Sequence, residues 1–150
     1  MLKQFLVGGA VSICNIAIHA VVMTTIVGVA RRTAAKQKAS HPLVFLVVVM
    51  IATVSALMVA HTCEVFVWAL GYLIVDAAPP GSGLVYFAFV NYATLGYGDI
   101  VPVKEWQLLG PITAMNGALL FGWSTAVIFE VLRRAMLLAS PPTDDRQRHL

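Results

Sequence analysis

Charged residues are scarce in this sequence: lysine, arginine, aspartate and glutamate together make up 11% of 150 residues, whereas hydrophobic residues make up 59%. A soluble domain of this size usually carries about twice that charged fraction. Too little polar surface is available to cover a water-soluble globule, so we expect a protein embedded in a lipid bilayer. The net charge is only +3 and no aromatic residues interleave with the basic ones, so a nucleic-acid partner is not expected.

Other absences exclude further classes of protein. The only cysteines, Cys14 and Cys63, lie in apolar runs without the spacing of a disulfide framework, and we expect buried thiols. No apolar run carries arginine at every third position, which excludes a voltage sensor of the usual kind. The histidines and acids form no nucleophile arrangement, and the glycine pair Gly96 and Gly98 lacks a phosphate-loop lysine, so no enzyme is expected.

Three apolar runs are long enough to cross a bilayer: about Phe5 to Ala30, Leu43 to Val75, and about Leu108 to Leu132. Each meets the roughly 20 residues that a hydrocarbon core of about 30 Å requires. A cleaved signal peptide is an alternative for the first run, but its apolar character continues too far for a signal core. We therefore expect a retained helix and three spans in all.

A shorter apolar segment, LVYFAFVNYA at residues 84–93, lies between the second and third runs. It is only about half a membrane thick, which is typical of a re-entrant helix rather than a span. The prolines in residues 78–83 end the preceding helix, and Ser82 is a candidate cap for the next one. The predicted fold class is thus an all-α membrane protein with three transmembrane helices and one re-entrant helix.

The next residues, TLGYGD at 94–99, are polar and glycine-rich. Non-helical backbone at membrane depth survives only where protein or water shelters it, so this segment is expected to line a water-accessible path. Because glycine takes positive φ at little cost, Gly96 and Gly98 alternating with ordinary residues let successive carbonyls face a common axis. Such carbonyls can replace the hydration shell of a cation, and the C-terminal dipole of the preceding short helix favours positive charge.

TLGYGD resembles the selectivity filter of potassium channels, and GDIVP at residues 98–102 resembles the chain that leaves that filter. From about Leu43 to Arg134, the order of outer helix, outer loop, pore helix, filter and inner helix is also similar to the pore module of that family. Because the family filter takes four loops and one chain supplies one, the resemblance implies a homotetramer. Potassium, as the permeant ion, is the only implied cofactor.

The resemblance also implies residue roles. The backbone carbonyls of four consecutive residues would coordinate K⁺: Thr94, Leu95, Gly96 and Tyr97. The Thr94 hydroxyl would add a further ligand, and the Tyr97 ring would point away from the axis and brace the filter. Gly98 and Asp99 would support the filter, with Asp99 held by hydrogen bonding at the outer mouth.

The chain departs from the family pattern behind the filter. Leu95 replaces the more usual valine or isoleucine. Val90 stands where some members carry an acid paired to the filter aspartate, so that pair is missing. Tyr86 and Phe87 occupy positions that are often tryptophan. Because Phe87 cannot donate a hydrogen bond to Tyr97, we expect the filter to be braced in another way.

The third run holds candidate gate and cavity residues. Asn116 would either face an aqueous cavity or hydrogen-bond to a neighbouring helix. Gly117 would either permit bending or allow close packing, and packing is favoured for Gly122. Glu130 precedes the arginines at 133–134 by three and four residues, so it would form a local ion pair or contribute to a charged ring at the inner mouth.

Four polar residues inside the first two runs are candidates for one intramembrane cluster: Asn15, His19, His61 and Glu64. Ionisable groups in hydrocarbon are costly and usually pair inside the protein, so the first helix is expected to pack on the second. Three interpretations remain open: a structural hydrogen-bond network, a proton-sensitive element with titrating histidines, and a metal site from His19, His61, Glu64 and Cys63.

Lysine and arginine gather at residues 31–38 and 133–148, and only Lys3 and Lys104 lie elsewhere. Since basic residues favour the cytoplasmic side, we expect a multi-pass plasma-membrane protein with its N-terminus outside and its C-terminus in the cytoplasm. The expected division is a transmembrane helix at 1–30, a basic cytoplasmic loop at 31–42, the pore module at 43–134 and a short cytoplasmic tail at 135–150. No soluble regulatory domain is expected.

The sequence therefore predicts a potassium-selective channel that conducts passively through a tetrameric filter. One alternative is a weakly selective cation channel of the same architecture. Another is a non-conducting membrane subunit or sensor that keeps the filter segment as a scaffold. A potassium transporter subunit is a third alternative, but such subunits resemble several linked pore repeats with degenerate filters, whereas this chain carries one intact filter.

Overall fold

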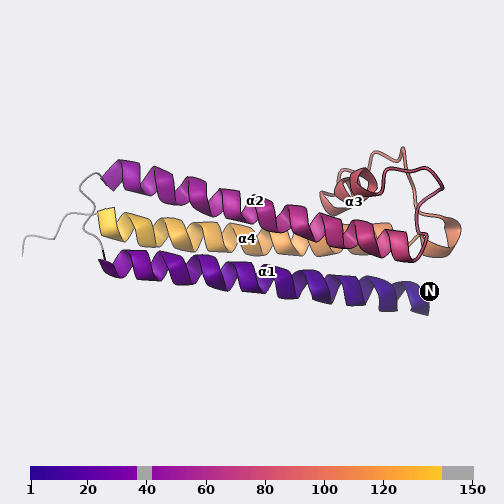
Figure 1. Cartoon of the computed structure of the whole chain (residues 1–150), viewed down its shortest axis with the longest axis horizontal. Helices are drawn as coiled ribbons and strands as arrows, with labels where there is room; N and C mark the ends of the chain where they lie inside the picture. Colours follow the sequence, from indigo (N-terminus) through magenta and orange to yellow (C-terminus); the bar gives the residue numbers. More distant parts are fainter. Residues whose placement is uncertain (37–41, 140–150) are drawn as a thin grey trace, which may run out of the picture.

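The computed structural model of the protein describes residues 1–36 and 42–139, and the regular elements in these residues are helices. Three long helices lie side by side, and a short helix lies against them near one end (Figure 1). The elements are, in chain order, α1 (Leu2–Lys36), α2 (Pro42–Ile74), α3 (Leu84–Tyr92), the 3₁₀ turn η1 (Lys104–Trp106) and α4 (Leu109–Ala139).

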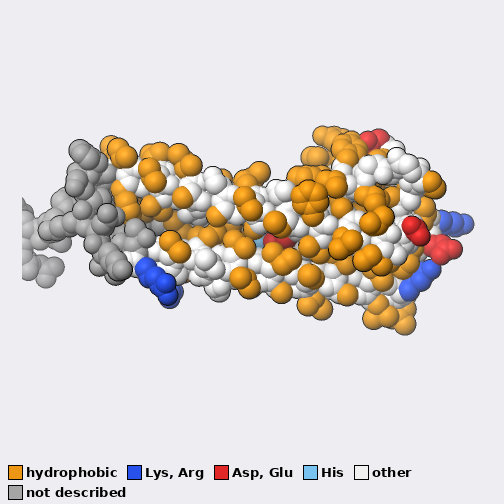
Figure 2. Space-filling view, in the orientation of Figure 1, with side chains coloured by type: hydrophobic (Ala, Val, Ile, Leu, Met, Phe, Trp, Pro, Cys, Tyr) orange, Lys and Arg blue, Asp and Glu red, His pale blue; other side chains and the backbone are white. Residues whose placement is uncertain are grey.

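The three long helices are apolar enough and long enough to cross a membrane, over residues Leu2–Arg32, Leu43–Ile74 and Lys104–Leu137. Figure 2 shows hydrophobic side chains along the length of the molecule and most of the charged side chains near its two ends. This distribution matches a bilayer with polar surfaces on either side. The predicted all-α fold with three membrane-spanning helices is confirmed, and the protein belongs in a lipid bilayer.

The long helices extend further than the sequence predicted. α1 continues past Ala30 through Arg31 and Arg32 to Lys36, so the first half of the expected loop at 31–42 is helical, and α4 continues to Ala139. Arginine, alanine and lysine are strong helix formers, and long basic side chains can reach the membrane surface from a helix end. Lys38, Arg146 and Arg148 lie outside the described residues.

The N-terminus lies at the same end of the molecule as α3 and η1 (Figure 1). There the Lys3 ammonium lies 2.9 Å from a Glu105 carboxylate oxygen and 4.8 Å from the centre of the Trp106 ring. The Gln4 side-chain oxygen accepts a hydrogen bond of 2.8 Å from the Leu108 amide at the start of α4, where backbone donors lack helical partners. These contacts fix the register of α1 against α4.

Aromatic side chains hold α3 against the long helices. The rings of Tyr72 on α2 and Phe87 on α3 have centres 4.8 Å apart, and the Tyr72 hydroxyl lies 2.6 Å from the Thr113 hydroxyl on α4. The residue at the N-cap of α3 is Gly83, without a side-chain cap hydrogen bond, so the prediction that Ser82 caps this helix is wrong. α3 is positioned by packing rather than by a cap.

The expectation that both cysteines are buried is wrong, because Cys14 and Cys63 are exposed on the surface of the protomer. Each precedes a buried polar residue, Asn15 or Glu64, that faces the helix interface. Consecutive residues on an α-helix point about 100° apart, so a thiol next to an inward-facing residue can lie outside the interface. The polar residue occupies the inner position and the thiol faces outward.

Gly117 is placed where α4 meets the C-terminal end of α3. A Cβ atom built at this position would lie 2.0 Å from the Tyr92 carbonyl oxygen, so Gly117 serves close packing of the helices. Gly122, for which packing was expected, has no atom within 4 Å of such a Cβ in the described protomer. The two glycines of α4 therefore have different surroundings.

We expect Gly117→Ala to lower the stability of the folded protein by about 3 kcal/mol, because the added methyl group collides with backbone rather than with a movable side chain. Thermal unfolding in detergent, followed by circular dichroism, measures this effect. Gly122→Ala is the matched control, since alanine raises helix propensity by about 1 kcal/mol and has space in the protomer. A Gly117→Ala protein that melts at or above the wild-type temperature would contradict the packing.

Candidate functional site

The chain leaves α3 through a tight hydrogen-bonded turn. The amide of Thr94 donates to the Asn91 carbonyl at 3.0 Å, and the amide of Leu95 donates to the Val90 carbonyl at 2.9 Å. This pair of bonds is the Schellman pattern, whose left-handed position is usually glycine. Here Thr94 occupies it with φ of 59°. A β-branched residue in this conformation is strained, and such strain is concentrated at functional sites.

Backbone conformation alternates along the filter segment, which we define as residues 94–99. Thr94, Gly96 and Gly98 have φ of 59°, 60° and 76°, whereas the residues between them, Leu95 and Tyr97, are not in the positive-φ region. Alternation of this kind allows successive carbonyl groups to face the same side of the chain. The segment can therefore present a row of backbone oxygens, as the sequence predicted from its two glycines.

The filter segment is not covered by the rest of its own protomer. All six of its residues are exposed, with Leu95 52% and Tyr97 65% accessible. Backbone at membrane depth needs protein or water around it. Whatever shelters this segment therefore comes from outside the single chain.

Tyr86 holds the filter aspartate. Its hydroxyl donates a hydrogen bond of 2.7 Å to the Asp99 carboxylate, while Phe87 and Val90 are buried in the protomer. This hydrogen bond is the main cause that lowers the pKa of Asp99 below its usual value and raises the pKa of Tyr86. The sequence showed that the usual hydrogen-bond partners of this aspartate are missing. The hydroxyl of Tyr86 could have indicated which residue takes their place.

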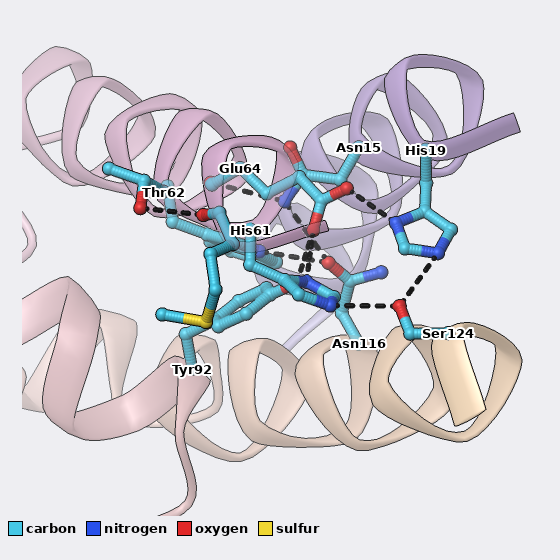
Figure 3. A network of polar contacts seen from close by, with 10 residues as sticks. Asn15, His19, His61, Thr62, Glu64, Tyr92, Asn116 and Ser124 are labelled. Carbon is cyan, nitrogen blue, oxygen red and sulfur yellow. Dashed lines mark hydrogen bonds and ion pairs between the residues drawn. The ribbon is translucent and has the colours of Figure 1, made fainter. Parts of the chain in front are cut away.

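A buried polar network lies behind the filter segment, where α1, α2 and α4 meet (Figure 3). Its centre is the Glu64 carboxylate, which lies 2.8 Å from His19 Nδ1 and 2.9 Å from His61 Nδ1. The Nε2 atoms of the two histidines both face the Ser124 hydroxyl, at 3.3 Å for His19 and 2.9 Å for His61. The structure thus brings together His19, His61 and Glu64, and adds Ser124 from α4.

Tyr92 links this network to the filter segment. Its hydroxyl donates to the Glu64 carboxylate and lies 2.9 Å from His61 Nδ1. Since Tyr92 is the last residue of α3 and precedes Thr94 by two residues, the network holds the helix end from which the filter starts. Sequence analysis did not single out Tyr92, although a tyrosine in an otherwise apolar short helix needs a partner for its hydroxyl.

Asn15 and Asn116 extend the network across the bundle. The Asn15 side-chain amide donates to the Glu64 carbonyl and to Asn116 Oδ1, each at 3.2 Å, and the Trp68 indole donates to the same Asn116 oxygen at 3.0 Å. Asn116 is only 3% exposed. Of the two alternatives for this residue, the structure has the hydrogen bond to neighbouring helices and not the aqueous cavity.

Two further candidates fall outside the network. Glu130 forms ion pairs with Arg133 and Arg134 on its own helix, which is the local alternative for this residue within the protomer. Cys63 is exposed, whereas the residues whose ligand atoms converge are His19, His61 and Glu64, with those atoms within 4.8 Å of one another. Any metal bound here would be held without the cysteine.

Comparison with known proteins identifies a family. A family model described as "Ion channel" matches residues 43–134, which is more than half of the chain and spans α2, α3, the filter segment and most of α4. No curated protein and no solved structure matches the chain. α1, and with it Asn15 and His19, lies outside the matched region.

We expect Asp99 to titrate below its usual pKa of about 3.9 in the folded protein and Tyr86→Phe to move that pKa back toward it. Because the folded-state pKa is lowered, the stabilisation is complete above the unfolded-state pKa and is lost as pH falls through the folded value. NMR of the labelled carboxylate measures both proteins. An Asp99 pKa that is the same in wild type and Tyr86→Phe would contradict the assigned hydrogen bond.

Proposed function

The chain belongs to the ion channel family, and from that premise we propose that four copies form a potassium-selective pore at the filter segment. The observation that carries the proposal is the alternation of positive φ at Thr94, Gly96 and Gly98 in the sequence TLGYGD. A row of carbonyls on one side of the chain supplies the oxygen ligands that a dehydrated K⁺ requires.

The proposed ligands are the backbone carbonyls of the first four filter residues and the Thr94 hydroxyl. The carbonyls belong to Thr94, Leu95, Gly96 and Tyr97. Backbone oxygens carry no net charge, so they can replace water around a monovalent ion without binding it too tightly for conduction. The Leu95 side chain does not alter its carbonyl, and the Tyr86–Asp99 hydrogen bond supports the outer end of the segment.

A fourfold assembly follows from the chemistry of the proposed site. One chain supplies one row of carbonyls and leaves it exposed, so an ion could be surrounded only if further copies contributed theirs. The protomer also leaves apolar side chains uncovered on α4, including Met115 at 61% and Leu119 at 65% exposure. In the proposed homotetramer these face neighbouring copies or the central path.

We further propose that the N-terminus and the filter segment face outside in a plasma membrane and that the C-terminus is cytoplasmic. The Lys3–Glu105 ion pair joins the N-terminus to the outer loop at one end of the molecule. α1 and α4 run in the same direction, so the C-terminal end of α1 with Arg31 and that of α4 with Arg133 lie together at the other end of the molecule. Basic residues favour the cytoplasmic side.

The direct test is potassium-driven uptake of rubidium into liposomes that contain the purified protein. We expect uptake with the wild type and a loss of at least tenfold with Gly96→Ala, because a side chain at φ of 60° distorts the proposed row of ligands. Gly81→Ala is the matched control. Gly81 also has positive φ, 80°, and open space around it, but it lies outside the filter segment.

Each outcome decides between the alternatives. Rubidium uptake that survives Gly81→Ala and is lost in Gly96→Ala supports the proposal. Equal permeation of sodium and rubidium would indicate a weakly selective cation channel. No cation flux from the folded wild-type protein would indicate a non-conducting subunit.

A further inference from the structure

We propose that His19, His61 and Glu64 form a binding site for a divalent transition-metal ion of the zinc class, with Tyr92 closing the fourth position. The site lies in the polar network behind the filter segment (Figure 3). It is separate from the proposed potassium ligands, and it uses α1, which lies outside the region shared with the channel family.

The donor set is the first argument. The ligand atoms of the two histidines and the glutamate lie within 4.8 Å of one another. Both histidines turn the same nitrogen, Nδ1, toward the carboxylate, at 2.8 and 2.9 Å. Imidazole nitrogen and carboxylate oxygen are typical zinc ligands, whereas calcium and magnesium prefer oxygen alone.

The fourth donor comes from a different element. The Tyr92 hydroxyl contacts the Glu64 carboxylate and lies 2.9 Å from His61 Nδ1, so it borders two of the three ligands. Zinc in closed sites is tetrahedral, with bonds of about 2.0–2.1 Å, which places ligand atoms about 3.3 Å apart. To admit the ion, the two contacts between Nδ1 and the carboxylate would lengthen by about half an ångström, and ligand atoms up to 4.8 Å apart would approach by about 1.5 Å.

Ser124 supplies the outer contacts that a histidine-bound metal needs. A metal-bound histidine usually donates its other ring N–H to an oxygen, which fixes the ring. Here the Nε2 atoms of both histidines face the single Ser124 hydroxyl oxygen, which has two acceptor positions. With both Nδ1 atoms on a metal, both Nε2–H groups have an acceptor.

Charge balance is a further argument for a metal ion. Glu64 is fully buried, and among the described residues no lysine or arginine forms an ion pair with it. A buried carboxylate is costly without a positive partner. With both histidines neutral and each Nδ1–H directed at the carboxylate, Ser124 has one hydrogen for two facing Nε2 lone pairs, so one Nε2 atom also lacks a hydrogen-bond donor. A metal ion would give the carboxylate a positive partner. It would also bind both Nδ1 atoms, so that both Nε2 atoms carry hydrogens and need no donor.

A proton held by one histidine would also correct both deficits, and it is the alternative that the experiment must separate. A proton can be shared between only two ligand atoms at a time, whereas four possible metal-ligand atoms from α1, α2 and α3 converge here. Convergence of all four favours the metal ion.

Cobalt(II) is the probe, because tetrahedral Co²⁺ with nitrogen and oxygen ligands absorbs visible light. Full-length protein without a histidine tag is titrated with Co²⁺ in detergent, and Zn²⁺ is then added to displace it. We expect one tetrahedral site per chain and a loss of affinity of at least tenfold in His19→Gln, His61→Gln and Glu64→Gln. Ser124→Ala keeps the ligands and is expected to weaken binding about tenfold or more.

Two further variants keep the test decisive. His41→Gln with His149→Gln removes the other histidines of the chain and is expected to leave binding unchanged. Tyr92→Phe retains the buried ring, so it is expected to fold, to bind more weakly and to shift the cobalt spectrum. This variant decides the matter if Glu64→Gln does not fold.

The proposal is overturned if folded wild-type protein shows no tetrahedral cobalt spectrum, or if the His41 and His149 substitutions remove it. Proton uptake by the network without any metal binding would overturn it in favour of the proton alternative. Since binding is measured without ion flux, a protein that binds Co²⁺ but conducts no potassium would leave this proposal intact and refute only the channel proposal.

Discussion

A backbone carbonyl inside a bilayer has no water to bind, and this constraint governs the rest of the molecule. Helices satisfy it within themselves, and α1, α2 and α4 do so across the membrane. The filter segment cannot, because Thr94, Gly96 and Gly98 hold it out of the helical conformation and the protomer leaves it exposed. Its oxygens need partners from outside the chain, and in the proposed assembly a cation surrounded by several copies would supply them.

The structure behind the filter segment explains how so strained a segment is positioned. α4 approaches the end of α3 closely enough that only glycine fits at Gly117, and the Tyr92 hydroxyl binds the Glu64 carboxylate. His19 brings α1 into the same network, so a helix outside the channel family match contacts the support of the filter. An ion bound there would act on the segment through Tyr92, two residues before Thr94.

Sequence alone was informative where one local pattern decides the structure. Hydrophobic length predicted the three spans, and TLGYGD predicted the alternating backbone at Gly96 and Gly98. Sequence alone failed where the relative depth in the membrane of two segments far apart in the chain decides their contacts. Both cysteines were misplaced for that reason, because Asn15 and Glu64 occupy the inward-facing positions. The Tyr86–Asp99 bond was missed although the tyrosine hydroxyl was a signal for it. Helix ends were also missed, since α1 continues through its basic residues.

We propose that the filter segment selects potassium in an assembly of four chains. The most direct measurement is the reversal potential of the reconstituted protein in a planar bilayer with potassium on one side and sodium on the other. We expect a reversal potential close to the potassium equilibrium value. Currents that reverse near zero in this gradient, from protein shown to be folded, would contradict it.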